Sequence, residues 1–530
     1  MSKNHNNMRA TSALAMTRRS AITGFGCALA GAALSGTGLA LADGTEQAAS
    51  DEVSIAFSDS GIKVDGEDIS LDEDEHVYLA HDVVYYEDRD EYDSGNPYGE
   101  GTDDERHSAE DAAVVSVVHI TQAGTYRLTG SISAGQVWVD LGKDAAEDAS
   151  AKVTLVLDNL DITCEVAPAV VFRRVYECDG DWSADTASAT VDTSNAGAVV
   201  VIADGSVNNV TGSHVARIYK DNGKQKKLWK IDGAFYSFMS LNIEGEQDGT
   251  GVLNITADNE GLDSELHLTI NGGNVSIASQ DDGINTNEDG VSVTTINGGC
   301  LDIRVDGGTG EGDGIDSNGW LVINGGSVTA AACAASGDAG IDSDMGIYIN
   351  GGTVMASGNM YDRIEDSGQN YVVFSFAERQ QGGTTYTLED VGSMPIGSYT
   401  PANDFTYLVI SDGNMSAAYY RLLQGEAPLS GIVSAGEMGS GGMGGGPRPD
   451  GEMRPPEGVP GQERPQPGKG GMTMDPPGQE RPEDGVRPQR PEGFGGMPDA
   501  MQADGERVTE FAIAEGGNFI MQVAPAEAEN

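Results

Sequence analysis

The sequence predicts an all-β protein that folds as a parallel β-helix, with short strands stacked coil upon coil. The first observation is a repeat, because Ile-Asn-Gly-Gly occurs at spacings of 26, 27 and 26 residues, at positions 270–273, 296–299, 323–326 and 349–352. Repeats of this period indicate stacked units that bury their apolar faces against one another. The second observation is the alternation of apolar and polar residues within each unit, which has the period of a strand.

Superposing the units predicts where their apolar residues lie. A second phrase, Gly-Ile-Asp-Ser or a close variant, runs in step with the first and starts at Gly261, Gly283, Gly314 and Gly340. Like residues then stack on like in two inward columns, one of Leu262, Ile284, Ile315 and Ile341 and one of Ile270, Ile296, Ile323 and Ile349. Asn-Gly-Gly supplies the positive φ that a sharp turn requires. No helix-length pattern alternates with the strands, which argues against an α/β barrel.

Residues 1–42 are predicted to be a signal peptide and not part of the fold. They carry four basic residues and no acid, then an apolar stretch, then the small-x-small pattern Ala40-Leu41-Ala42. The pair Arg18-Arg19 resembles a twin-arginine export signal, and an ordinary secretory signal is the alternative. We therefore expect a secreted or cell-surface protein without a lasting membrane span.

Four segments follow the signal peptide. Residues 43–113 are expected to hold one N-terminal strand and an acidic insertion. Residues 114–431 are expected to form the β-helix, together with strands outside the repeat that close its open end. Residues 436–504 contain 13 of the 19 prolines, so this segment cannot bury a core and is expected to be disordered. Residues 505–530 are expected to hold a terminal strand and a tail.

The net charge excludes two classes of partner. The chain has 84 Asp and Glu against 30 Lys and Arg, a formal net charge of −54 that becomes −58 once residues 1–42 are removed. Binding to nucleic acid or to an anionic membrane requires clustered basic residues, so neither is expected. The carboxylates either keep a secreted protein soluble or bind a hard cation such as Ca²⁺. The sequence leaves the oligomeric state open.

Acidic and amide residues recur at the repeated turns, where neighbouring coils lie about 4.8 Å apart. Stacked carboxylates at that separation repel one another, and Ca²⁺ is bound by about six to eight oxygens of this kind. We therefore predict at least one Ca²⁺ site, with ligands drawn from Asp281, Asp282, Asn285, Asp313, Asp316, Asp338 and Asp342. Oxygen-only ligands argue against zinc or copper there. The alternative is a solvated acidic edge whose residues serve turn geometry alone.

Outward tryptophans are the candidates for stacking on sugar rings. Strand alternation directs Trp138 and Trp320 away from the interior, and packing beneath a loop is the alternative for each. A basic patch over residues 217–230 contains Lys220 and Trp229, and it either holds an acidic sugar or pairs with neighbouring acids. These four residues are the predicted polysaccharide ligands.

The cysteines allow two interpretations. Cys164 and Cys178 lie close enough in sequence to form a disulfide in an oxidising compartment. The alternative is that they are small buried apolar residues. Because no Cys-x-x-Cys pattern occurs, a zinc site built on cysteines is not expected.

The ordered set of phrases resembles a known family. The phrases are Ile-Thr-Gln-Ala-Gly-Thr-Tyr-Arg-Leu-Thr-Gly at 120–130, Val-Thr-Leu-Val-Leu-Asp-Asn-Leu-Asp-Ile-Thr at 153–163, and the two repeated turns. Over residues 53–65 and 114–431 the chain resembles a carbohydrate-binding family whose type member is a cellulose- and calcium-binding, right-handed parallel β-helix similar to polysaccharide lyases. The resemblance implies a right-handed coil, calcium and a polysaccharide ligand. The family often places a lysine after the Gly-Ile-x-Ser phrase, where this chain has Glu265, Asn287, Asn318 and Asp344.

Three functions remain open at this point. The first is a secreted, non-catalytic protein that binds Ca²⁺ at its turns and recognises a cellulose-like or acidic polysaccharide. The second is a Ca²⁺-dependent, pectate-type polysaccharide lyase, for which Arg304 is the single candidate base. The missing turn lysines argue against the lyase. The third is a structural or adhesive protein of the cell surface.

Overall fold

The computed structural model describes residues 52–85, 107–180, 182–215, 231–365, 368–437 and 509–522, all of which belong to the compact unit Gln47–Asn530. Helix within these ranges is limited to α1 (Ala109–Ala112) and a 3-10 turn (Ala145–Glu147), and neither is long or apolar enough to cross a membrane. The predicted all-β class is confirmed. The predictions for residues 1–42, for the basic patch from 217 to 230 and for residues 438–504 lie outside the described residues.

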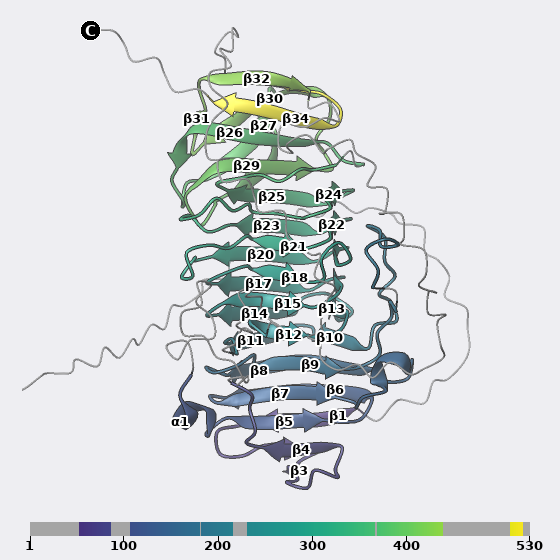
Figure 1. Cartoon of the computed structure of the whole chain (residues 1–530). Coiled ribbons are helices and arrows are strands. Elements are labelled where there is room, and N and C mark those ends of the chain that lie inside the picture. The colour runs from purple at the N-terminus through teal and green to yellow at the C-terminus, as the bar shows by residue number, and fades with distance from the viewer. Residues whose placement is uncertain are drawn as a thin grey trace, which may run out of the picture. The chain divides into compact units, whose positions relative to one another are not determined.

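Three ladders of parallel strands run through the repeat, and each coil adds one strand to a ladder (Figure 1). Ladder I contains β10 (Ala198–Ile202), β13 (Leu241–Gly245), β16 (Leu268–Ile270), β19 (Val293–Ile296), β22 (Trp320–Ile323) and β24 (Gly346–Ile349). Ladder II contains β11 (Val207–Gly212), β14 (Val252–Ala257), β17 (Asn274–Ser279), β20 (Cys300–Val305), β23 (Ser327–Ala331) and β25 (Thr353–Gly358). Ladder III contains β5 (Ser116–Ile120), β7 (Gly135–Asp140), β9 (Val170–Arg174), β12 (Gly233–Ser237), β15 (Glu260–Ser264), β18 (Ile284–Thr286) and β21 (Ile315–Ser317).

Two long strands join the first two ladders near the start of the stack. These are β6 (Gly124–Ile132) and β8 (Val153–Thr163), which pair in parallel with each other. The first half of β8 pairs with β10 and its last residues pair with β11. The single strand β8 therefore belongs first to ladder I and then to ladder II. In the later coils two separate short strands occupy these two positions.

Antiparallel strands close both ends of the stack. At the N-terminal end β4 (Val77–Ala80) pairs with β5, and β1 (Val53–Phe57) pairs with β6 beside the short β2 (Lys63–Val64) and β3 (Glu67–Asp68). At the other end β29 (Phe405–Asp412) pairs antiparallel with β25. The remaining strands beyond it are β26 (Tyr371–Gln380), β27 (Tyr386–Asp390), β28 (Pro395–Tyr399), β30 (Ala418–Gln424), β31 (Ala427–Pro428), β32 (Ile432–Glu437), β33 (Phe511–Ile513) and β34 (Gly517–Gln522).

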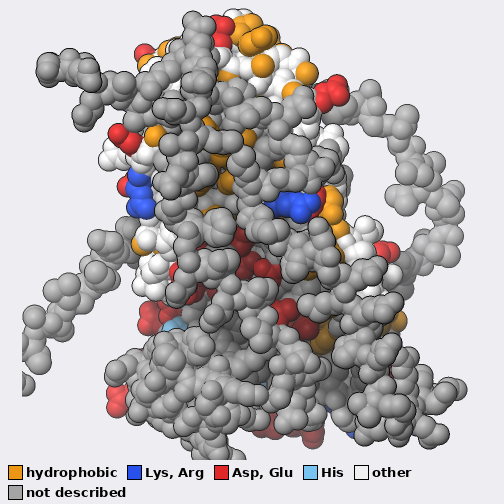
Figure 2. All heavy atoms as spheres, turned by 45° about the horizontal axis from the view of Figure 1, so that its top comes forward, with side chains coloured by type: hydrophobic (Ala, Val, Ile, Leu, Met, Phe, Trp, Pro, Cys, Tyr) orange, Lys and Arg blue, Asp and Glu red, His pale blue; other side chains and the backbone are white. Residues whose placement is uncertain are grey.

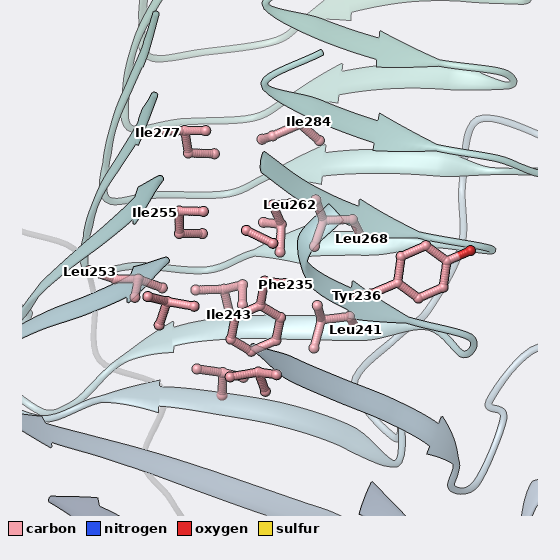
Figure 3. Packing of buried hydrophobic residues seen from close by; sticks show 14 of the residues in the cluster. Phe235, Tyr236, Leu241, Ile243, Leu253, Ile255, Leu262, Leu268, Ile277 and Ile284 are labelled. Atoms are coloured by element: carbon pink, nitrogen blue, oxygen red, sulfur yellow. The ribbon is translucent and has the colours of Figure 1, made fainter. Parts of the chain in front are cut away.

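The interior is built from the predicted columns of apolar residues. Leu262, Ile284 and Ile315 are register partners in ladder III and are fully buried. In Figure 3, Leu262 and Ile284 face Ile255 and Ile277 across the interior. The second predicted column, from Ile270 to Ile349, is likewise in register and buried. Stacking like on like therefore fixes the register of the coils.

The asparagines of the Ile-Asn-Gly-Gly turns form an amide ladder. Nδ2 of Asn297 donates to Oδ1 of Asn271 at 2.8 Å, Asn324 donates to Asn297 at 2.9 Å, and Asn350 donates to Asn324 at 2.8 Å. The second glycine of each turn has a φ between +81° and +84°. The repeated asparagine thus links successive coils, and the glycine supplies the backbone conformation predicted for the turn.

The glycine of the repeated Gly-Ile-Asp-Ser phrase is required by the close approach of neighbouring coils. A Cβ at Gly283 would lie 2.6 Å from the carbonyl oxygen of Gly314 and would overlap the side chain of Ile303. We expect Gly283→Ala to destabilise the protein by about 3 kcal/mol. The added methyl group would press on the backbone of the next coil, which cannot move aside as the end of a flexible side chain can. Urea unfolding measures this, with Gly337→Ala, where a Cβ meets nothing within 4 Å, as the matched control. Equal stabilities of the two variants would contradict the packing described.

The disulfide considered for Cys164 and Cys178 does not form, since both cysteines are free. Cys164 is fully buried, and burial raises the pKa of its thiol to about 11. A thiol that stays protonated is unreactive, so Cys164 acts as a small apolar residue of the interior.

Candidate functional site

One row of outward side chains runs along ladder III and is the candidate functional site. In-register partners on parallel strands project from the same face of a sheet. The strand register joins the members of this row from one end of the ladder to the other: Tyr78, His119, Trp138, Val171, Tyr236, Asp263, Asn285 and Asp316. We call these residues, with Asp342 of the next coil, the outer row. Figure 3 shows Tyr236 pointing away from the interior, opposite to Phe235.

The N-terminal end of the outer row is aromatic and half-buried. The rings of Tyr78 and His119 stack with centroids 4.6 Å apart and an angle of 6° between their planes. Nε2 of His119 lies 2.9 Å from a carboxylate oxygen of Asp82, which fixes the orientation of the ring. Trp138 is the next member along the ladder and is also half-buried. Parallel aromatic faces on successive strands, partly open to solvent, are suited to apolar contact with flat ligands.

A buried aromatic and an arginine occupy the middle of the outer row. Tyr236 is fully buried and donates a hydrogen bond from its hydroxyl to Glu265. The guanidinium of Arg173, from β9, lies 4.3 Å from the ring centroid of Phe238. Burial, and then the neighbouring charge of Arg174, lowers the pKa of Arg173. This is the one arginine of ladder III whose surroundings disfavour its charged form among the described residues.

The C-terminal end of the outer row is acidic. Asp313, Asp316 and Asp342 are each at most 9% exposed and offer one oxygen each within 4.8 Å of one another. Asp232, Glu260 and Asp263 form a second such triad on earlier coils, and all three are buried. Of the seven predicted metal ligands, the structure therefore brings Asp313, Asp316 and Asp342 together. In Figure 2, acidic side chains gather toward the middle of the face shown and basic ones lie at its flanks.

Asp282 and Asp338, two of the remaining predicted ligands, and Asp313 of the triad hold neighbouring coils together. Asp282 accepts a hydrogen bond from the backbone N–H of Asp313 at 2.7 Å, and Asp313 accepts one from Ala339 at 2.6 Å. Asp338 accepts one from the N–H of Gly312 at 2.7 Å. These bonds serve turn geometry, as the alternative interpretation of the sequence expected.

The acids of these turns disfavour one another's ionisation. Burial, followed by the charge of Asp342, raises the pKa of Asp313 well above its ordinary value. Burial, followed by the charges of Asp316 and Asp281, does the same for the pKa of Asp282. A bound cation would relieve this repulsion, because it favours the charged form of every carboxylate around it.

Asn285 lies between the two acidic triads in the register of ladder III. Its Nδ2 donates to Oε1 of Glu260 at 3.0 Å, which orients the amide. Its Oδ1 is buried and accepts no hydrogen bond among the described residues, although the residue is only 3% exposed. A buried carbonyl oxygen without a donor is costly, and a hard cation satisfies such an oxygen.

The prediction for Trp320 as a stacking residue needs correction. Its side chain projects outward from β22, as the alternation predicted, but it is only 8% exposed. It packs with Val293 and Val322 beneath Ala187, Ala189 and Val191. The covering segment comes from more than a hundred residues earlier in the chain, and it leaves no open ring face for a sugar.

We expect Trp320→Ala to destabilise the protein by about 3 kcal/mol and to leave ligand binding unchanged, because the ring fills an apolar contact and not a ligand site. Urea unfolding gives the first quantity, and a binding assay well below the melting temperature gives the second. A variant with unchanged stability and lost binding would restore the original assignment.

Arg304, the predicted base, is held by a carboxylate. Its Nε and Nη2 lie 2.9 Å from the two oxygens of Asp306. A base must first lose its proton, and a bidentate carboxylate stabilises the protonated guanidinium. Arg304 also lies on ladder II and not on the outer row. The other two predicted polysaccharide ligands, Lys220 and Trp229, lie outside the described residues.

Several residues in or beside the outer row were not predicted from the sequence. Tyr78 and His119 precede the repeat, and no phrase marked their strands. The alternation in Ser116–Ile120 would have directed His119 outward, since Val118 and Ile120 are buried. Arg173 could have been found in the same way from Val170–Arg174. Asp232 carried no signal, because the phrase that follows it has Tyr236 where the later coils have Asp or Asn.

Comparison with known proteins gives two matches. Residues 115–179 and 177–372 match the family described as carbohydrate-binding domain-containing protein. The solved structure of a polysaccharide lyase-like protein from C. thermocellum, in its gadolinium derivative, is similar over 60% of this chain and 92% of that chain, with 18% identity and a TM-score of 0.32. No curated protein matches the chain.

Proposed function

Because the chain belongs to the carbohydrate-binding domain-containing protein family, we propose that it is a secreted, non-catalytic protein that binds polysaccharide along the outer row of ladder III. The proposal includes a right-handed winding of the three ladders as a parallel β-helix. The observation that carries it is the alignment of Tyr78, His119 and Trp138 on successive strands. All three side chains are half-buried, and the indole of Trp138 is the ring on which a pyranose would stack, beside the stacked pair of Tyr78 and His119.

The proposal also includes Ca²⁺ at the acidic end of the row. Asp313, Asp316 and Asp342 would hold it, since their oxygens lie within 4.8 Å of one another and can enclose an ion at about 2.4 Å from each. The unpaired carbonyl oxygen of Asn285 belongs to the next strand of the same ladder and supports a cation-binding role there. When bound, the ion supplies positive charge on a face that would otherwise repel an acidic polysaccharide. The aromatic end needs no such charge and suits a neutral glucan.

Retention on insoluble polysaccharide tests the proposal. Untagged protein lacking residues 1–42 is mixed with cellulose and with insoluble pectin, with and without Ca²⁺, and a glycan array identifies the sugar. We expect retention on at least one polymer, and a Ca²⁺ dependence if that polymer is acidic. Absence of binding to every polysaccharide would contradict the proposal.

A second candidate, a polysaccharide lyase, is favoured by Arg173 and not by Arg304. Burial lowers the pKa of Arg173, which is the direction of shift that a general base requires. Such a base would take the proton from C5 of a uronate, the C4–O bond would break by elimination, and the leaving oxygen would receive a proton. Polygalacturonate with Ca²⁺ tests this by the ultraviolet absorbance of the unsaturated product. Activity that Arg173→Met removes and Arg304→Met retains would establish the lyase, and absence of product from the wild type would exclude this reaction on that substrate.

A further inference from the structure

Two histidines and an aspartate from three distant segments converge at one corner of the stack. His107 precedes α1, His214 follows β11, and Asp258 follows β14. Each offers one ligand atom, a ring nitrogen or a carboxylate oxygen, within 4.8 Å of the other two. The two imidazole rings lie 4.8 Å apart between centroids, at an angle of 49°. This corner lies outside the outer row and outside both acidic triads.

The backbone around this corner is firmly placed. Gly212 and Ala257, the last residues of β11 and β14, are register partners, so the residues that follow them emerge side by side. The backbone N–H of Ser213 donates to Ala167, and that of Val215 donates to Ile231. His214 is therefore held between two anchored neighbours, opposite Asp258.

Ser213 orients the carboxylate. Its hydroxyl donates to Oδ2 of Asp258 at 2.6 Å and lies 3.0 Å from Nε2 of His107. Oδ1 of Asp258 faces Nδ1 of His214 at 3.4 Å. Metal-ligating carboxylates and imidazoles are commonly supported by hydrogen bonds of this kind from a second layer of residues.

We propose that His107, His214 and Asp258 form a binding site for a divalent first-row transition metal ion, with Zn²⁺ as the probe. Two imidazoles and one carboxylate suit borderline metals, whereas Ca²⁺ and Mg²⁺ are bound by oxygen ligands. Three protein ligands leave a coordination position for water. The ion would tie the segment before α1 to the adjoining ends of two coils, because its ligands come from all three. The site is thus distinct from the Ca²⁺ site in both ligand chemistry and place.

Titration calorimetry of untagged, chelator-treated protein with ZnCl₂ tests the proposal. We expect one Zn²⁺ per chain, and a loss of affinity of about 100-fold in His107→Gln and in His214→Gln, since each removes a ligand. Ser213→Ala keeps all three ligands and should weaken binding about tenfold. His76→Gln, an exposed histidine outside the cluster, is the matched control and should bind as the wild type does. Zn²⁺ binding that is absent in the wild type, or unchanged in both histidine variants, would overturn the proposal.

A measurement on the wild type covers the case in which the variants do not fold. X-ray absorption at the zinc edge of the loaded protein should show two imidazole ligands, and a spectrum without imidazole would overturn the proposal. Asp316→Asn, which removes a ligand of the Ca²⁺ in the proposed function, should leave Zn²⁺ binding intact and so separates the two sites. Loss of Zn²⁺ binding in that variant would place the ion at the acidic turns and contradict the assignment.

Discussion

Removal of Ca²⁺ is expected to lower the melting temperature of the protein, and to lower it more at about pH 8 than at about pH 5. The reason is that burial, and then the charges of neighbouring carboxylates, raise the pKa of Asp282 and of Asp313. A bound cation offsets this repulsion only when the carboxylates are charged. If Ca²⁺ binds only the folded state, it would stabilise that state by about 2.7 kcal/mol when the free Ca²⁺ concentration is about 100 times its Kd.

The direction of the pH dependence follows from the raised pKa values. An aspartate in an unfolded chain has a pKa of about 3.9. Without metal, the folded protein therefore binds more protons than the unfolded chain between that value and the raised pKa values. The stability contribution of Asp282 and Asp313 is fully present below about pH 4 and is lost as the pH rises through their folded pKa values. Bound Ca²⁺ would take the place of those protons and preserve the stability at higher pH.

The double variant Asp282→Asn/Asp313→Asn is the control. Its amides do not ionise, so the metal-free variant should lose this pH dependence and respond weakly to Ca²⁺. Subtracting the melting temperatures of the double variant from those of the wild type cancels the contributions of other titrating groups. Among these are His107 and His267, whose pKa values are lowered by burial. Differential scanning calorimetry of the wild type and of the double variant, each with EGTA and with Ca²⁺, gives four curves of melting temperature against pH. A wild-type melting temperature that chelation leaves unchanged at every pH would contradict a Ca²⁺ site.

Replacement of Trp138 by alanine is expected to weaken polysaccharide binding by about 30-fold, the effect of losing a contact worth about 2 kcal/mol. Trp138 is the largest ring of the aromatic end, and its in-register neighbour His119 already stacks on Tyr78. Removing the indole would remove the largest apolar ring surface from this end of the row. Trp138→Phe retains a flat ring and should retain most of the affinity.

Tyr419→Ala provides the matched control for Trp138→Ala. Tyr419 is 61% exposed on β30, in a sheet beyond the stack, and should contribute nothing to polysaccharide binding. Binding isotherms on the polymer that the array selects give the affinities. Because Trp138 also packs against the interior, its variants must first be shown to be folded at the assay temperature. Equal affinity of wild type and Trp138→Ala would contradict the placement of the site.

The repeat carried most of the information that the sequence held about the fold. Ile284 and Ile315 recur at the same place in successive units, and a residue that recurs in a stack must lie against its own copies. The same reasoning placed Asp313, Asp316 and Asp342 near one another, because they occupy equivalent turns. The amide ladder from Asn271 to Asn350 was not foreseen, although it follows from the same stacking, since asparagine was considered only for its turn conformation.

The parts that the sequence did not reveal depend on contacts between distant segments. Alternation showed that Trp320 points outward, but only the folded chain shows that Ala187 and Val191 cover it. His107 and His214 meet although their positions follow no repeat. Tyr78 and His119 precede the repeat, so no stacking argument joined them to Trp138. Periodicity predicts which face a residue occupies, whereas loops decide whether that face stays open.

A crystal structure of the protein with a bound oligosaccharide, prepared with Ca²⁺, tests the central claim most directly. The account predicts sugar bound at the aromatic end of the outer row, in contact with Trp138 and the Tyr78–His119 pair. The described residues offer a clear alternative, a polar groove of about 480 Å³ lined by residues 244–249 and 271–273. Sugar bound in that groove, with the aromatic end of the outer row empty, would contradict the account.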